Sequence, residues 1–158
     1  MKPDRRPGMS VQETSVLLSL VSTVIIYAIF FTCTATGAVQ GADQVGLFIG
    51  LVIAQIVAVV SIQIALAIWR GTQKADERDA LIEIRSFRNA YVVLTSSVSM
   101  VTIGYLLWGG IAGEPEALAA GVAPPSVALV GNSILLCFVL AEIAKSATQL
   151  VLYRKGAI

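Results

Sequence analysis

The chain has 158 residues, of which 56% are hydrophobic and only 13% are charged, so it is far more apolar than a soluble globular domain. It contains no histidine, the commonest ligand of haem, copper and zinc sites, and neither cysteine belongs to a CxxC pair, so we expect no metal and no cofactor. The net charge of +1 gives no indication that the protein binds nucleic acid, and we expect no direct nucleic-acid binding.

Four long apolar runs follow one another along the chain, at residues 16–38, 45–69, 90–112 and 127–152. Only the last of them contains Asp, Glu, Lys or Arg, namely Glu142 and Lys145. Each run exceeds the roughly 20 residues that a helix needs to cross a hydrocarbon core of about 30 Å. Lipid offers the backbone no hydrogen-bond partners, so each run must be helical. The sequence therefore predicts one all-α domain, an integral membrane four-helix bundle over residues 1–158.

The basic residues are confined to one side of these four spans. All eleven Lys and Arg lie before the first span, between the second and third, or at and after the end of the fourth. In the other two loops the charged side chains are all acidic: Asp43, Glu114 and Glu116. The positive-inside rule then places both termini and the second loop in the cytoplasm. We expect a multi-pass protein of the bacterial inner membrane.

The second span carries small residues one turn apart, at Gly46, Gly50, Ala54 and Ala58. Such a row lets another helix backbone approach closely. It indicates either packing within the chain or the seam of a homodimer, and the sequence does not choose between them.

The loop between the second and third spans holds a dense charged segment, which we expect to form a helix over about residues 76–89 and to continue into the third span. Two groups of interaction residues fall on roughly opposite sides of it: Asp76, Asp79 and Glu83 on one, and Arg78, Arg85 and Arg88 on the other. No neighbour three or four residues away joins an acid to a base, so the segment lacks the pairs that stabilise a solvated helix. Its charges are therefore expected to find partners elsewhere: other cytoplasmic elements, a second subunit, lipid phosphates or a soluble protein. The three carboxylates spread over about 10 Å, too far apart for one metal shell.

Glu142 is the acidic residue inside a predicted span, near its cytoplasmic end, with Lys145 one turn further on. A charge within a span usually faces the bundle and has a partner. Arg85 or Arg88 has the right depth to form a structural ion pair with Glu142. The alternative is a proton- or cation-binding carboxylate, with Gln63, Gln55 and Asn132 lining a path.

The run Asp76-Glu-Arg-Asp79-x-x-Ile82-Glu83, followed by Arg85-x-x-Arg88-x-Ala90-Tyr91-x-x-Leu94, resembles the signature of a family of small uncharacterised prokaryotic four-helix membrane proteins. The resemblance implies four spans with this motif opening the third. That family has no established activity, so no residue role is carried over. Some of its members are encoded beside small helix-turn-helix regulators, which implies a cytoplasmic regulatory protein as partner.

No catalytic motif is present, and we do not expect an enzyme. The sequence favours a non-enzymatic interaction or regulatory module, or a subunit of a membrane assembly, acting through its charged helix. Its expected partners are the lipid bilayer, further copies of itself or other members of a membrane complex, and a cytoplasmic regulatory protein. The alternative function is a small proton- or cation-coupled transporter or channel that uses Glu142.

Overall fold

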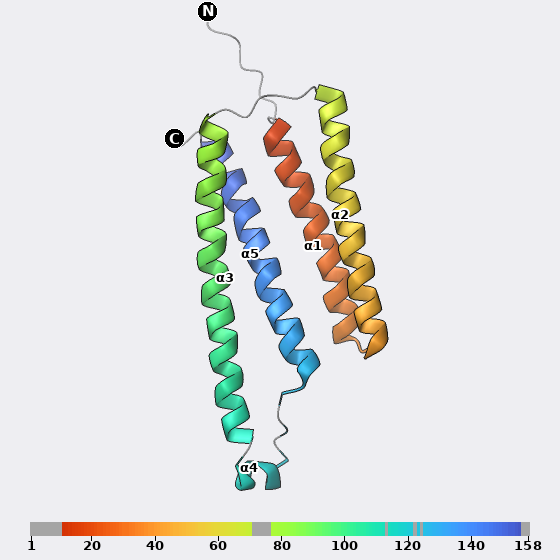
Figure 1. The fold of residues 1–158 in the computed structure, drawn as a ribbon, viewed down its shortest axis with the longest axis vertical. Helices are drawn as coiled ribbons and strands as arrows, with labels where there is room; N and C mark the ends of the chain where they lie inside the picture. Colours follow the sequence, from red (N-terminus) through yellow and green to blue (C-terminus); the bar gives the residue numbers. More distant parts are fainter. Residues whose placement is uncertain (1–10, 71–76, 113, 122, 124, 156–158) are drawn as a thin grey trace, which may run out of the picture. The chain divides into compact units, whose positions relative to one another are not determined.

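The computed structural model describes residues 11–70, 77–112, 114–121, 123 and 125–155, and these residues form helices joined by short turns (Figure 1). The helices are α1 (Val11–Ala35), α2 (Ala42–Arg70), α3 (Glu77–Ala112), α4 (Pro115–Ala119) and α5 (Val127–Lys155). The short helix α4 was not expected from the sequence.

Within the described ranges, the four longer helices are each long and apolar enough to cross a membrane, which confirms the prediction of an all-helical chain with four candidate spans. The charged segment is continuous with the third candidate span, and together they form the 36-residue helix α3. Asp76, the expected start of that helix, lies outside the described residues.

The chain divides into two compact units. The first unit comprises residues 1–86 and 146–158, and the second comprises residues 87–145. The first unit thus contains α1, α2, the start of α3 and the end of α5, whereas the second contains the remainder of α3 and α5 together with α4.

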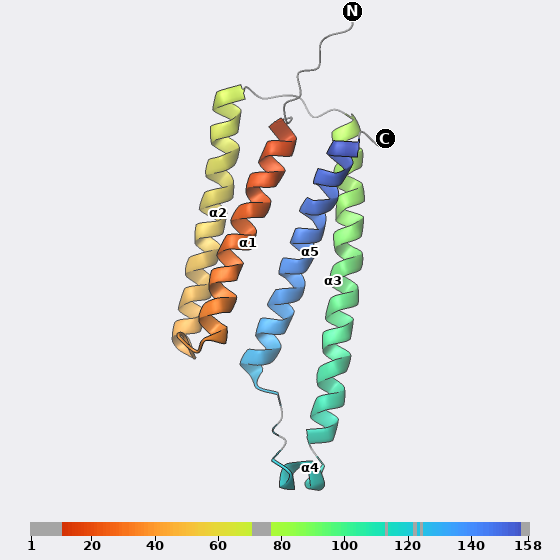
Figure 2. The same cartoon turned by 180° about the vertical axis from the view of Figure 1, so that it is seen from behind.

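In the first unit, α1 and α2 run side by side as an antiparallel hairpin (Figures 1 and 2). Gly37 ends α1 with a φ of 69°, and the N–H of Ala38 donates to the carbonyl of Cys33 at 3.1 Å. This is the usual way in which a left-handed glycine stops a helix and turns the chain. Between the two helices, the buried ring of Phe30 meets the ring of Phe48 edge-on, with 5.8 Å between the centroids.

In the second unit, a serine side chain caps the first turn of α5. The hydroxyl of Ser126 accepts a hydrogen bond from the N–H of Leu129 at 3.2 Å, which is an N-cap. Further along, the hydroxyls of Tyr105 on α3 and Ser133 on α5 are 2.6 Å apart and share a hydrogen bond. The Tyr105 hydroxyl also lies 3.2 Å from the carbonyl of Leu129, to which it can donate.

Few of the large apolar side chains are covered by the chain itself. In the most apolar window of α2 none of the residues is buried, and in that of α5 the buried share is 17%. A single chain in water would leave this surface unfavourably exposed, whereas a bilayer solvates it. Length, composition and exposure therefore agree with a multi-pass membrane protein.

Candidate functional site

The start of α3, residues 77–86, packs into the first unit along one face. Ile82 and Ser86, one turn apart, are both fully buried. The Ser86 hydroxyl donates to the carbonyl of Glu83 at 2.7 Å, so it brings no unsatisfied polar group into this contact. This part of α3 is therefore a packed element of the unit and not an isolated surface helix.

Asp79 joins three helices at this end of the first unit. Its carboxylate accepts a hydrogen bond from Nε2 of Gln12 on α1 at 3.1 Å. The phenol of Tyr153, near the end of α5, donates a second hydrogen bond to the same carboxylate. Hydrogen bonds to a charged acceptor are stronger than neutral ones, so Asp79 ties α1, α3 and α5 together.

A second tie links α1 and α5 beside it. Nε of Arg154 lies 3.3 Å from Oε1 of Glu13, and the Glu13 side chain is only 13% exposed while that of Arg154 is 67% exposed. Such a pair costs more to break than a fully exposed surface pair, because little water is available to solvate the Glu13 carboxylate once Arg154 is removed.

The predicted acidic stripe is divided by this packing. Asp79 is half-buried and engaged inside the chain, whereas Glu83 is exposed. On the basic side, Arg78 is half-buried, and its Nε is buried without a hydrogen-bond partner in the described part of the chain. Arg85 is exposed. The face turned away from the unit thus keeps only some of the charges that the sequence grouped.

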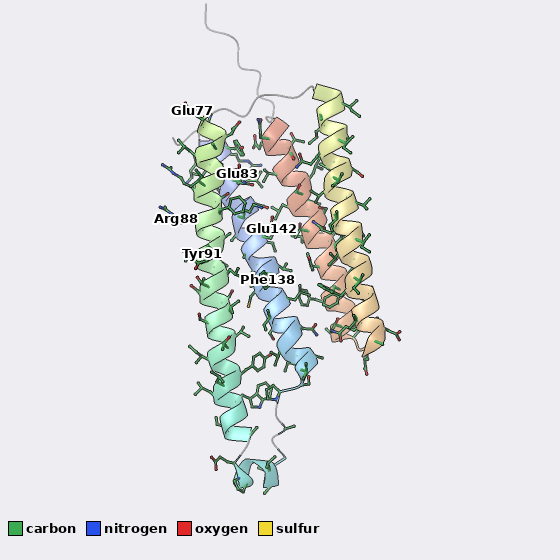
Figure 3. The ribbon with its side chains drawn as sticks, in the orientation of Figure 1. Glu77, Glu83, Arg88, Tyr91, Phe138 and Glu142 are labelled. Atoms are coloured by element: carbon green, nitrogen blue, oxygen red, sulfur yellow. The ribbon has the colours of Figure 1, made fainter. Side chains whose placement is uncertain are left out.

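That outer face also carries large apolar side chains. Leu81 is 44% exposed and Ile84 is 65% exposed. Glu77 and Arg85 flank them on the same face and are exposed too (Figure 3 labels Glu77). We call Glu77, Leu81, Ile84 and Arg85 the outer face of α3. Arg88, on the same helix but in the second unit, is also exposed.

Within the second unit, Glu142 forms an ion pair with Lys145 on its own helix. Its Oε1 lies 2.9 Å from Nζ of Lys145, three residues along α5. The Lys145 ammonium also lies 4.7 Å from the ring centroid of Phe87, as a cation–π contact. The Glu142 side chain is 51% exposed, and that of Lys145 is 22% exposed. A pair three residues apart forms within one helix and needs no second span beside it.

The three polar side chains expected to line a path, Gln55, Gln63 and Asn132, lie in different environments. Gln55 donates from Nε2 to the buried hydroxyl of Thr23 on α1 at 2.8 Å, so it joins α1 to α2. Its Oε1 is buried without a hydrogen-bond partner among the described residues. Gln63 is exposed on α2. Asn132 belongs to the second unit, whereas both glutamines belong to the first.

The row of small residues on α2 is not the face that packs on α1. Gly46, Gly50 and Ala54 are exposed, and Ala58 is half-buried. A Cβ added at Gly46 or Gly50 would meet nothing within 4 Å. Close approach to α1 therefore does not explain why the glycines stand in this row.

The sequence did not single out a cleft in the second unit. Its volume is about 290 Å³, and it is lined by Val101, Gly104, Tyr105, Trp108 and Ser133. The rings of Tyr105 and Trp108 lie nearly parallel, with centroids 6.2 Å apart. The spacing of Tyr105 and Trp108, three residues apart, is the sequence signal that could have indicated it. Among the residues that the structure describes, no group of His, Cys, Asp or Glu side chains could hold a metal.

Comparison with known protein families, with curated proteins and with solved structures finds no match for this chain. The resemblance of the Asp76–Leu94 motif to a family of small prokaryotic membrane proteins therefore stays a prediction. The chemistry of the candidate site rests on its own residues.

Proposed function

We propose that this protein is a non-enzymatic interaction or regulatory module, or a subunit of a membrane assembly, in the bacterial inner membrane. It acts through the charged start of α3, which carries the outer face. The single observation that supports this proposal most is an α-helix far longer than a membrane span, whose first ten residues are packed on one side and open on the other.

The length of α3 supports this role for the start of the helix. Thirty-six residues at about 1.5 Å each extend about 54 Å, against a hydrocarbon core of about 30 Å. The uncharged residues 90–112 are enough to fill that core. We infer that the first residues of α3 lie at the membrane surface, on the side where the sequence gathers its Lys and Arg.

The packing of this projection makes it suitable for recognition. Buried Ile82 and Ser86, together with the bonds from Gln12 and Tyr153 to Asp79, fix the helix in one orientation. A surface that is already ordered loses little conformational entropy when a partner binds. The exposed charge of Arg85 on the outer face then gives that partner a fixed point to recognise.

The geometry of Glu142 does not favour the transport alternative. A coupling carboxylate is expected to face a polar interior, where its protonation changes with the transported ion. Glu142 is half-exposed and already paired with Lys145 at 2.9 Å. We therefore retain the interaction function alone.

The experiment is native mass spectrometry of the protein purified from its own membranes. Arg85→Glu with Arg88→Glu reverses two exposed charges without touching the buried contacts, and it should remove co-purifying subunits while the four-helix fold persists. Lys155→Glu is the matched control, because Lys155 is an exposed basic residue beyond the candidate site, at the end of α5. Partners retained equally by both variants, or absent from the wild type, would argue against the proposal.

A further inference from the structure

Arg78, in the first turn of α3, has no counter-ion among the residues that the structure describes. Its side chain is half-buried, and its Nε is buried without a hydrogen-bond partner in that part of the chain. The neighbouring carboxylate of Asp79 is engaged by Gln12 and Tyr153. A guanidinium that is partly removed from water without an anion beside it is unfavourable. An anion from outside the chain is therefore expected at Arg78.

The contacts of Asp79 indicate the level at which Arg78 stands. Asp79 bonds to Gln12, at the start of the candidate span of α1, and to Tyr153, near the end of the candidate span of α5. Arg78 is the next residue outward along α3, so it stands where two other candidate spans end. In a bilayer this is the level of the lipid headgroups, on the side where the sequence gathers its Lys and Arg.

The chemistry of the side chain suits a phosphate. A guanidinium is always charged, and its planar arrangement of N–H donors matches two oxygens of a phosphate at once. Because Nε is buried, the two terminal nitrogens of Arg78 are the donors left for such a contact. Basic sites beside membrane helices on the cytoplasmic side are known to bind the headgroups of anionic lipids.

Other basic side chains nearby do not call for a bound anion in the same way. Arg85 and Lys155 are exposed, so water and dissolved ions can solvate them. Arg154 already has Glu13 as its ion-pair partner. Arg78 differs from all three, because it is partly buried and lacks a carboxylate.

We propose that Arg78 binds the phosphate of an anionic phospholipid in the leaflet nearest the start of α3. The phosphate accepts hydrogen bonds from the terminal nitrogens of the guanidinium, and the acyl chains stay within the bilayer. The bound lipid supplies the negative charge that the chain does not provide, and it thereby stabilises the packing of α3 on α1 and α5 around Asp79. This inference goes beyond the proposed function and requires no protein partner.

The first test compares the stability of Arg78→Met with that of the wild type in two kinds of mixed micelle. One contains phosphatidylcholine, whose headgroup has no net charge, and the other contains phosphatidylglycerol, which is anionic. In phosphatidylcholine, Arg78→Met should have the higher midpoint of thermal unfolding, because methionine removes the unpaired charge and keeps an apolar side chain in its place. In phosphatidylglycerol the order should reverse, because the lipid binds and stabilises the wild type alone.

Lys155→Met is the matched control, since it removes one exposed positive charge at the end of α5. Its midpoint relative to the wild type should be the same in both micelles. Inorganic phosphate added to the phosphatidylcholine micelles should not reproduce the stabilisation by phosphatidylglycerol, because a free ion is not held at the membrane surface.

The second test counts retained lipid by native mass spectrometry of the full-length protein. Arg78→Met should lower the retention of phosphatidylglycerol about tenfold, the loss expected for one charge-assisted contact. Arg78→Lys keeps the charge but loses the planar pair of donors, so its retention should lie between that of the wild type and that of Arg78→Met. Lys155→Met should retain as much lipid as the wild type.

Three results would overturn the inference: the same order of stability in both micelles, equal loss of lipid from Arg78→Met and Lys155→Met, or full stabilisation by inorganic phosphate. The last result would assign Arg78 to a small soluble anion. None of them bears on the interaction function, which is tested separately by reversing Arg85 and Arg88.

Discussion

The hydrogen bond between Gln55 and Thr23 gives the sharpest prediction about stability. Nε2 of Gln55 donates to the Thr23 hydroxyl at 2.8 Å, and Thr23 is only 5% exposed. Oε1 of Gln55 is buried without a hydrogen-bond partner among the described residues. Removing the Thr23 hydroxyl should therefore lower the free energy of unfolding by a different amount from removing the Gln55 amide.

Thr23→Val removes the acceptor and leaves both ends of the Gln55 amide unpartnered in a buried position. Leaving a buried polar group unsatisfied costs about 1–3 kcal/mol, and side-chain hydrogen bonds between membrane helices average about 0.6 kcal/mol, with a maximum of about 1.7 kcal/mol. We expect Thr23→Val to lower the free energy of unfolding by about 1–2 kcal/mol. Gln55→Leu removes the unsatisfied carbonyl together with the donor, and the Thr23 hydroxyl can bond back to its own helix, so its cost should stay below about 1 kcal/mol.

Unfolding by SDS titration in mixed micelles, followed by circular dichroism, measures both variants and the double variant. The double variant should be about as stable as Gln55→Leu alone, so the double-mutant coupling should equal the cost of Thr23→Val, about 1–2 kcal/mol. Ser22→Ala is the matched control, because the Ser22 hydroxyl donates to the Ser19 carbonyl on its own helix at 2.9 Å and should contribute almost nothing between helices. If Gln55→Leu proved more destabilising than Thr23→Val, or the coupling were indistinguishable from zero, the bond would not act as described.

Three further variants test other contacts. Tyr105→Phe should lower the free energy of unfolding by about 1 kcal/mol in the same titration, because the Tyr105 hydroxyl bonds to Ser133 at 2.6 Å. Tyr91→Phe, at an exposed tyrosine, should change it by less than about 0.5 kcal/mol, and equal effects of the two variants would contradict the role of the Tyr105–Ser133 bond. Glu142→Gln should cost no more than about 1 kcal/mol, since its ion pair is half-exposed, and proton flux into liposomes should equal that of the wild type; a flux in the wild type that the variant abolishes would reinstate transport. Gly50→Leu should not lower stability, because the added side chain meets nothing within the chain, but it should shift the oligomer mass in detergent if the row on α2 is a seam between copies; lost stability would show that the row packs internally.

The sequence alone determined the helical class and the number of candidate spans. Hydropathy accumulates along the chain, and lipid permits little but helix for a long apolar run, so both follow without knowledge of neighbours. The continuity of the charged segment with the third span was predictable for the same reason, since nothing between Glu77 and Ala112 breaks a helix.

The sequence did not determine which side chains of that charged segment face inward. Helical spacing placed Asp79 and Glu83 in one stripe, but Asp79 bonds to Gln12 and Tyr153 while Glu83 is exposed. The outcome depends on contacts between residues 67 and 74 positions apart, which no local pattern encodes. The pair between Glu142 and Lys145 is local by contrast, because the two residues stand three apart on one helix. Local periodicity fixes what a helix could present, whereas only the packing of its neighbours decides which of those side chains are engaged.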